Sequence, residues 1–267
     1  MYTNTKTQNR NKYIAIAPAF SCFTGMVSVA LGLASVHVKS PTFFPRLYYT
    51  LTDPITTTST EQRIEERFGI DYEGDSDETQ QQVLEGHLRT IDGTNPALLD
   101  DCQKIVLYSD TVKSSSLVKP ILDYDGLANA GEGVIDVLHN SLGIVVHEAA
   151  HLKHHHVPDE FNQKLDRIFG NSYGKDEIQN FWPDGTDGPR NGFVRAYGSN
   201  SKKENVATYA EKAYEPAFWK HPELQRSDKY LQTVSLLHEY GFITGRDHHW
   251  ITAAIKNDQT IVAAMKE

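Results

Sequence analysis

Two histidines and a glutamate near the middle of the chain have the spacing of a metal site. The segment from Gly143 to Pro158 reads GIVVHEAAHLKHHHVP and contains His147, Glu148 and His151. Residues four apart on a helix lie one turn above each other, so the two imidazoles can reach one ion. The pattern H-E-x-x-H is that of zinc hydrolases, in which the glutamate is the general base that takes a proton from water. The segment therefore predicts a catalytic zinc centre.

The residues around this motif favour a helix packed inside the protein. Three aliphatic residues precede the motif and two alanines lie within it. Asn140 or Ser141 can cap the first turn, and Pro158 can end the helix. The competing interpretation is two ordinary histidines on a helix face with an unrelated glutamate between them.

Three more histidines follow the motif. His154, His155 and His156 lie where the helix is expected to end, and the helix dipole favours solvated imidazolium groups there. We expect solvated side chains at these positions rather than ligands of a second metal. Four further histidines are expected to be structural: His221, His238, His248 and His249.

A catalytic zinc has three protein ligands and one open position, so the third ligand must come from outside the motif. The metzincin extension would need a glycine at position 154 and a histidine at position 157, but the chain has His154 and Val157. Asp187, in the segment DGTDG, resembles an aspzincin ligand but has the wrong spacing, which makes it an outside candidate.

Glu204 is the best candidate for the third ligand. Ser199 or Ser201 can cap a helix that has Glu204 in its first turn. A glutamate near the start of a second helix, packed across the first, can reach an ion held by two histidines. Three other glutamates are lesser candidates, which could equally be solvated acids: Glu177, Glu211 and Glu215.

The pairing of HEAAH with AYGSNSKKENVA resembles the glutamate-zincin peptidases related to the catalytic domain of anthrax lethal factor. Their pattern is H-E-x-x-H, then Tyr-Gly, then a helix that opens E-x-x-A-E. Their tyrosine lies seven residues before the ligand glutamate, which is also the interval between Tyr197 and Glu204. The upstream segments IEERFGI and LLDDCQKIVLYSD are similar to the preceding helix and strand of that family. The resemblance covers roughly residues 59 to 220.

This resemblance implies a set of roles for the site. The implied zinc ligands are His147, His151 and Glu204. The implied general base is Glu148, and the implied oxyanion donor is Tyr197. One position departs from the family pattern, because Thr208 replaces the second glutamate. That glutamate would ordinarily orient a ligand histidine through a hydrogen bond. The neutral Thr208 can accept such a bond, but we expect lower metal affinity or rate.

The remaining patterns predict an α+β, zincin-like domain with a small mixed sheet on the motif helix and a mainly helical C-terminal half. We expect a helix at 59–70 and, within 71–91, a turn followed by a second helix. Three further helices are expected at about 202–219, 226–240 and 248–265. Strands are expected at 104–110 and 133–139, and an irregular connection at 169–193.

The N-terminal segment differs from the rest of the chain. Residues 13–36 carry no charge, which fits a signal peptide cleaved after Ala34 or a single membrane anchor, with a buried core helix as a further alternative. The predicted divisions are a signal peptide or anchor (1–37), a linker (38–58) and a metallopeptidase domain (59–267). The expected location is secreted or membrane-anchored, and an acid-free basic start leaves a mitochondrial address open.

Composition narrows the function further. A net charge of −9 and the lack of a basic patch argue against nucleic acid as the main partner. The sequence predicts a zinc-dependent endopeptidase acting on a peptide or protein, with strand 133–139 as an edge that could pair with the substrate. The alternatives are a non-catalytic metal-binding or partner-binding domain, and histidines that buffer metal or sense pH.

Overall fold

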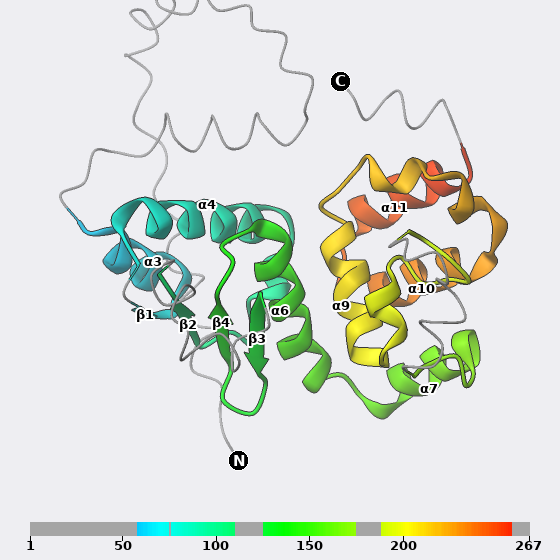
Figure 1. Cartoon of the computed structure of the whole chain (residues 1–267), viewed down its shortest axis with the longest axis horizontal. Coiled ribbons are helices and arrows are strands. Elements are labelled where there is room, and N and C mark those ends of the chain that lie inside the picture. Colours follow the sequence, from blue (N-terminus) through cyan, green and yellow to red (C-terminus); the bar gives the residue numbers. More distant parts are fainter. Residues whose placement is uncertain (1–57, 75, 110–124, 175–187, 258–267) are drawn as a thin grey trace, which may run out of the picture. The chain divides into compact units, whose positions relative to one another are not determined.

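The computed structural model describes residues 58–74, 76–109, 125–174 and 188–257 of the chain, and the fold is α+β as predicted (Figure 1). Its helices and strands are α3 (Thr60–Phe68), β1 (Asp71–Gly74), α4 (Glu78–Thr94), β2 (Lys104–Leu107), β3 (Gly126–Asn129), β4 (Val134–Val137), α6 (Leu142–His155), α7 (Asp159–Phe169), α9 (Lys202–Lys212), α10 (Asp228–Glu239) and α11 (Gly245–Ile255). Short 3₁₀ helices are η1 (Pro96–Leu98), η2 (Ala196–Ser199), η3 (Phe218–Lys220) and η4 (Pro222–Arg226).

The sheet is small and mixed, with the strand order β1-β2-β4-β3. Strands β1, β2 and β4 are parallel, whereas β3 runs antiparallel to β4. The prediction that segment 133–139 forms an edge is wrong, because β4 lies between β2 and β3. The edge next to β4 is β3, and sequence patterns missed this strand.

Helix α6 carries the histidine motif and packs between the sheet and α9. It contacts β3 and β4 as well as α9, and these elements lie side by side in Figure 1. The Oγ of Ser141 caps the helix by accepting a hydrogen bond from the Ile144 amide at 3.3 Å. The aliphatic residues before the motif place Val145 and Val146 fully in the core. This burial fixes the face that α6 turns to α9.

The C-terminal half is mainly helical, as predicted, but its boundaries differ. The helix expected at 202–219 ends at Lys212, and the chain continues through η3 and η4. Helix α7 was not predicted, although Pro158 is followed by two acids and by Phe161, Leu165 and Phe169 at four-residue spacing. The expected turn before α4 contains β1, a short edge strand paired with β2.

Several predictions concern residues outside the described ranges. They include the signal peptide or anchor at 1–37, nearly all of the linker, and the lesser ligand candidates Glu177 and Asp187. Within the ranges that are described, no helix has the length and apolar character needed to cross a bilayer.

Candidate metal centre

Helices α6 and α9 bring three of the predicted ligands together. The donor atoms of His147, His151 and Glu204 all lie within 4.8 Å of one another. Oε2 of Glu204 is 3.1 Å from Nε2 of His147 and 3.3 Å from Nε2 of His151. Glu204 occupies the first turn of α9, whose N-terminus is capped by Ser201. The two helices therefore present two imidazoles and a carboxylate to one point.

These separations suit a zinc ion. Zinc binds imidazole nitrogen and carboxylate oxygen at about 2.0–2.2 Å, so two ligand atoms at a tetrahedral angle lie about 3.3 Å apart. The two contacts of Glu204 have this spacing, at 3.1 and 3.3 Å. The donor set of two histidines and one glutamate also matches a catalytic zinc site with an open position. The residues present fit the ion.

Glu148 lies between the two histidines of the motif in sequence and contacts strand β3. Its carboxylate accepts a hydrogen bond from the Ala128 amide, and burial raises its pKa above the usual range. A Cβ on Gly126 would lie 2.9 Å from Cγ of Glu148. The glycine on β3 therefore provides the space in which the predicted base sits.

Tyr197 lies in η2, at the approach to α9. Its ring centroid is 6.0 Å from that of His147, and the residue is 43% exposed. The residue thus comes from a different element than the predicted ligands and is exposed to solvent. The tyrosine predicted as oxyanion donor is near the ligand cluster.

The second ring nitrogen of His147 faces Glu211, one of the lesser ligand candidates. Nδ1 is 3.4 Å from Oε2 of Glu211, whose other oxygen is bound by Arg195 and Lys212 at 3.2 Å each. The hydroxyl of Thr208 instead donates to the Asn205 carbonyl at 2.9 Å. The carboxylate beside the histidine comes from position 211, which the family pattern does not indicate.

The two acids determine the charge of His147. Burial alone would lower its pKa, but the carboxylates of Glu204 and Glu211 raise the pKa to about 9. Burial also opposes ionisation of these glutamates. The positive charge of His147 nevertheless holds the pKa of each at about 2, helped by His151 for Glu204 and by Lys212 and Arg195 for Glu211. The cluster thus favours a cation beside ionised carboxylates.

The three histidines that follow the motif do not share one environment. His155 and His156 are exposed, as expected for a helix end. His154 is buried, so the prediction of a solvated side chain is wrong for this residue. Its Nε2 contacts Oδ1 of Asn162 on α7 at 3.1 Å, and the unpredicted helix α7 is what covers it.

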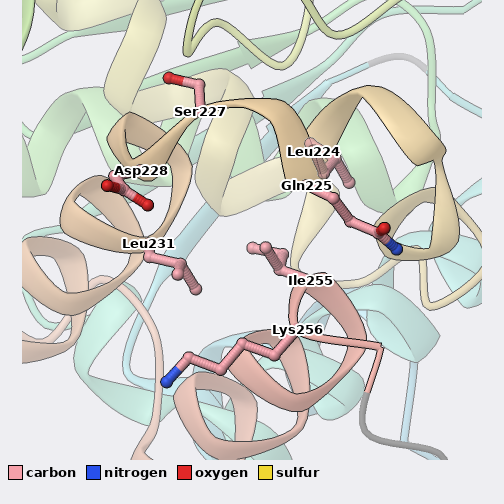
Figure 2. Close-up of a pocket in the computed structure, with 7 residues that line it drawn as sticks. All are labelled: Leu224, Gln225, Ser227, Asp228, Leu231, Ile255 and Lys256. Carbon is pink, nitrogen blue, oxygen red and sulfur yellow. The ribbon is translucent and has the colours of Figure 1, made fainter.

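A separate pocket lies between η4, α10 and α11, and none of the candidate site residues lines it (Figure 2). The aliphatic side chains of Leu231 and Ile255 point into the space between these elements. The pocket is lined by Leu224, Gln225, Ser227, Asp228, Leu231, Ile255 and Lys256. It offers one acid and one lysine but no histidine, unlike the cluster on α6 and α9.

Comparisons with known proteins give one distant likeness. No family model matches the chain, and no curated protein matches it. Among solved structures, a protein from Bacteroides caccae, provisionally assigned as a zinc-binding metallo-peptidase, has a TM-score of 0.40 and 15% sequence identity. The match covers 78% of this chain and 91% of that one. This likeness assigns no family to the chain.

Proposed function

We propose that this protein is a zinc-dependent endopeptidase. The observation that carries the proposal is the convergence of His147, His151 and Glu204 from two helices, at separations that suit zinc. Glu148 belongs to the same motif and is buried beside the histidines. Three ligands and a neighbouring carboxylate are the components that water-driven amide hydrolysis needs.

The side chains around the ligands have distinct roles in this reaction. When bound, zinc would make a water molecule more acidic and polarise the scissile carbonyl. The carboxylate of Glu148 takes the proton of the attacking water and gives it to the leaving amine, and its raised pKa suits both steps. The phenol of Tyr197 donates a hydrogen bond to the oxygen on which negative charge develops.

Strand β3 is proposed as the surface that holds the substrate. It is the edge strand beside α6, and its Ala128 amide already contacts the carboxylate of Glu148. An extended peptide that adds to such an edge forms backbone hydrogen bonds along it. Leu127, which is 53% exposed, offers an apolar contact on this strand. A bound peptide would therefore lie next to the predicted base.

The first test is zinc content, measured by plasma mass spectrometry on the full-length chain. We expect about one zinc per chain in the wild type and in Glu148→Gln, but none in Glu204→Gln. Glu215→Gln is the matched control, because Glu215 is an exposed acid that binds Lys212 rather than a histidine. Retention of zinc by Glu204→Gln would show that the third ligand lies elsewhere.

The second test is hydrolysis of a peptide library, read by mass spectrometry. The wild type should cleave internal peptide bonds. Glu148→Gln should cleave them about 10²- to 10⁴-fold more slowly while keeping its zinc. Zinc binding without any cleavage would leave a non-catalytic metal-binding or partner-binding domain as the function.

A separate proposal concerns the location of the protein and rests on the N-terminal segment alone. We propose that residues 13–36 direct the chain to secretion or anchor it in a membrane, with the catalytic domain beyond the linker. Fractionation of cells that express the full-length chain, with N-terminal sequencing of the product, distinguishes cleavage from anchoring.

A further inference from the structure

We infer that Glu211 is the positioning residue for His147, in place of the glutamate that the family pattern has at position 208. The inference rests on the proposed metal centre but concerns a different residue and a different measurement. It assigns Glu211 no direct contact with the ion or the substrate.

The two ring nitrogens of His147 face two different glutamates. Nε2 faces Glu204 and His151, where the ion would lie, so Nδ1 is the nitrogen left for a supporting partner. Oε2 of Glu211 is 3.4 Å from that Nδ1, and it can accept the Nδ1 proton. A carboxylate at this position fixes the tautomer in which Nε2 has a free lone pair for the metal.

The carboxylate of Glu211 is itself held by two cations, Arg195 and Lys212. Its side chain is only 9% exposed. Nη1 of Arg195 lies 3.2 Å from Oε1 and 3.4 Å from Oε2, and Nζ of Lys212 lies 3.2 Å from Oε1. Arg195 thus contacts both oxygens and Lys212 contacts Oε1, so the two cations orient the carboxylate while Oε2 faces Nδ1. The contact to His147 is therefore part of a fixed arrangement.

The neighbouring helix leaves space for the side chain of Glu211. Gly143 lies one turn before His147 on α6, and a Cβ there would be 3.3 Å from Cγ of Glu211. This is closer than most side-chain contacts allow, so a larger residue would press on the glutamate. The absence of a side chain at position 143 lets Glu211 lie against α6.

The packing around position 208 leaves little space for a supporting glutamate there. Thr208 is fully buried, and a Cβ on Gly198 would be 2.7 Å from its Oγ1. The longer side chain of a glutamate would not fit against η2 at this point. Positions 204, 208 and 211 share one helix face, so a carboxylate at 211 still faces α6, one turn further along. Thr208 therefore does not imply that His147 lacks support.

The test is zinc affinity of the full-length protein, measured by competition with a chromophoric chelator. Glu211→Ala should bind zinc 10 to 100 times more weakly than the wild type, the loss typical of removing a partner of a ligand histidine. Glu211→Gln, which keeps the volume and one acceptor oxygen, should lose less. Glu215→Gln is the matched control, because Glu215 is exposed and binds the same Lys212 at 2.7 Å; its affinity should not change.

A spectroscopic readout separates positioning from a general loss of structure. The visible absorption of the cobalt-substituted protein reports the geometry of the ligands. We expect it to change in Glu211→Gln while the circular dichroism of the chain stays that of the wild type. A Glu211→Gln variant with unchanged cobalt spectrum and unchanged zinc affinity would overturn the inference.

Two further outcomes are informative. If Thr208→Glu restores zinc affinity to Glu211→Ala, position 208 has room for the supporting acid and the inference is wrong. If the wild type binds no zinc, both the metal centre and the role of Glu211 are overturned. Normal zinc binding with a dependence on Glu211 but without peptide hydrolysis would contradict only the proposed function.

Discussion

His147 and His154 lie on the same helix, two turns apart, and both are buried, at 7% and 6% exposure. Their pKa values nevertheless move in opposite directions, to about 9 for His147 and to about 4 for His154. Burial disfavours the charged form of both rings. The difference must therefore come from the side chains that face them.

The two surroundings differ in chemistry. His147 faces the carboxylates of Glu204 and Glu211 from α9. The ring of His154 instead packs on Phe161 and Phe242, with centroid distances of 5.4 and 6.4 Å, and its Nε2 contacts the neutral amide of Asn162. One helix thus carries a histidine that faces two carboxylates, which favour positive charge beside them, and another histidine that is a neutral part of the core. The residues contributed by other helices decide which is which.

The strongest test of this comparison exchanges the two histidines for glutamine. His147→Gln removes a proposed ligand, so zinc affinity should fall by more than 100-fold, beyond the 10 to 100-fold typical of losing a supporting partner. His154→Gln should leave zinc affinity within about twofold, since its ring contacts α7 rather than the cluster. Chelator competition on both variants measures the difference. Equal losses in the two would mean that the metal lies further along α6.

The contrast also shows how much of the molecule could be predicted from the sequence. The motif helix and its cap depend on neighbours within four residues, so a local pattern was sufficient to predict that His147 and His151 share one helix face and that Ser141 caps the helix. The placement of Glu204 beside them required only the start of one more helix. The fold class followed from the alternation of apolar segments.

The features that were missed depend on contacts between distant segments. Strand β3 has the sequence Gly-Leu-Ala-Asn, without a β-branched residue, and is a strand because it pairs with β4. The contact between His147 and Glu211 depends on the packing of α9 on α6. The burial of His154 depends on the unpredicted helix α7. No spacing within the chain encodes these contacts directly.

Acid should destabilise the region around His154. The folded protein keeps this ring neutral down to about pH 4, whereas the unfolded chain takes up a proton near its ordinary value of 6.5. The unfolded state thus binds more protons between these values, and the unfolding free energy should fall as pH drops from 6.5 towards 4, by roughly 3 kcal/mol for a group with this shift. Denaturant unfolding of the metal-free chain across this range measures it.

The variant comparison isolates this contribution. His154→Gln should flatten the dependence between pH 4 and 6.5, whereas His155→Gln, an exposed neighbour, should keep it. The contribution of His147 has the opposite sign, because its raised pKa stabilises the metal-free fold below 6.5 and is lost as pH rises through about 9. An unchanged acid dependence in His154→Gln would contradict the buried, neutral ring.

Gly126→Ala should disturb the base while leaving the ligands in place. The new Cβ would lie 2.9 Å from Cγ of Glu148 and 2.7 Å from Cγ2 of Ile144, so either the strand or the carboxylate must shift. We expect peptide hydrolysis to fall about tenfold or more, with zinc content unchanged, because a displacement of about 1 Å in a catalytic site can cost up to 10²-fold in rate. Gly131→Ala, in the same hairpin, is the control, since its nearest contact would be an ordinary 3.8 Å. Equal activity in both variants would show that Glu148 does not need the space.

The smallest effect is expected at His155, the exposed neighbour of His154 on α6. Its ring lies 5.1 Å from that of His156 at the end of the helix. A charge at an exposed helix C-terminus contributes about 0.3–1 kcal/mol, so His155→Gln should change the unfolding free energy by less than about 1 kcal/mol, and added salt should reduce the change. Zinc affinity should be that of the wild type. A larger loss of stability or any loss of zinc would mean that His155 has a partner of its own, and that burial and facing side chains do not alone separate the histidines of α6.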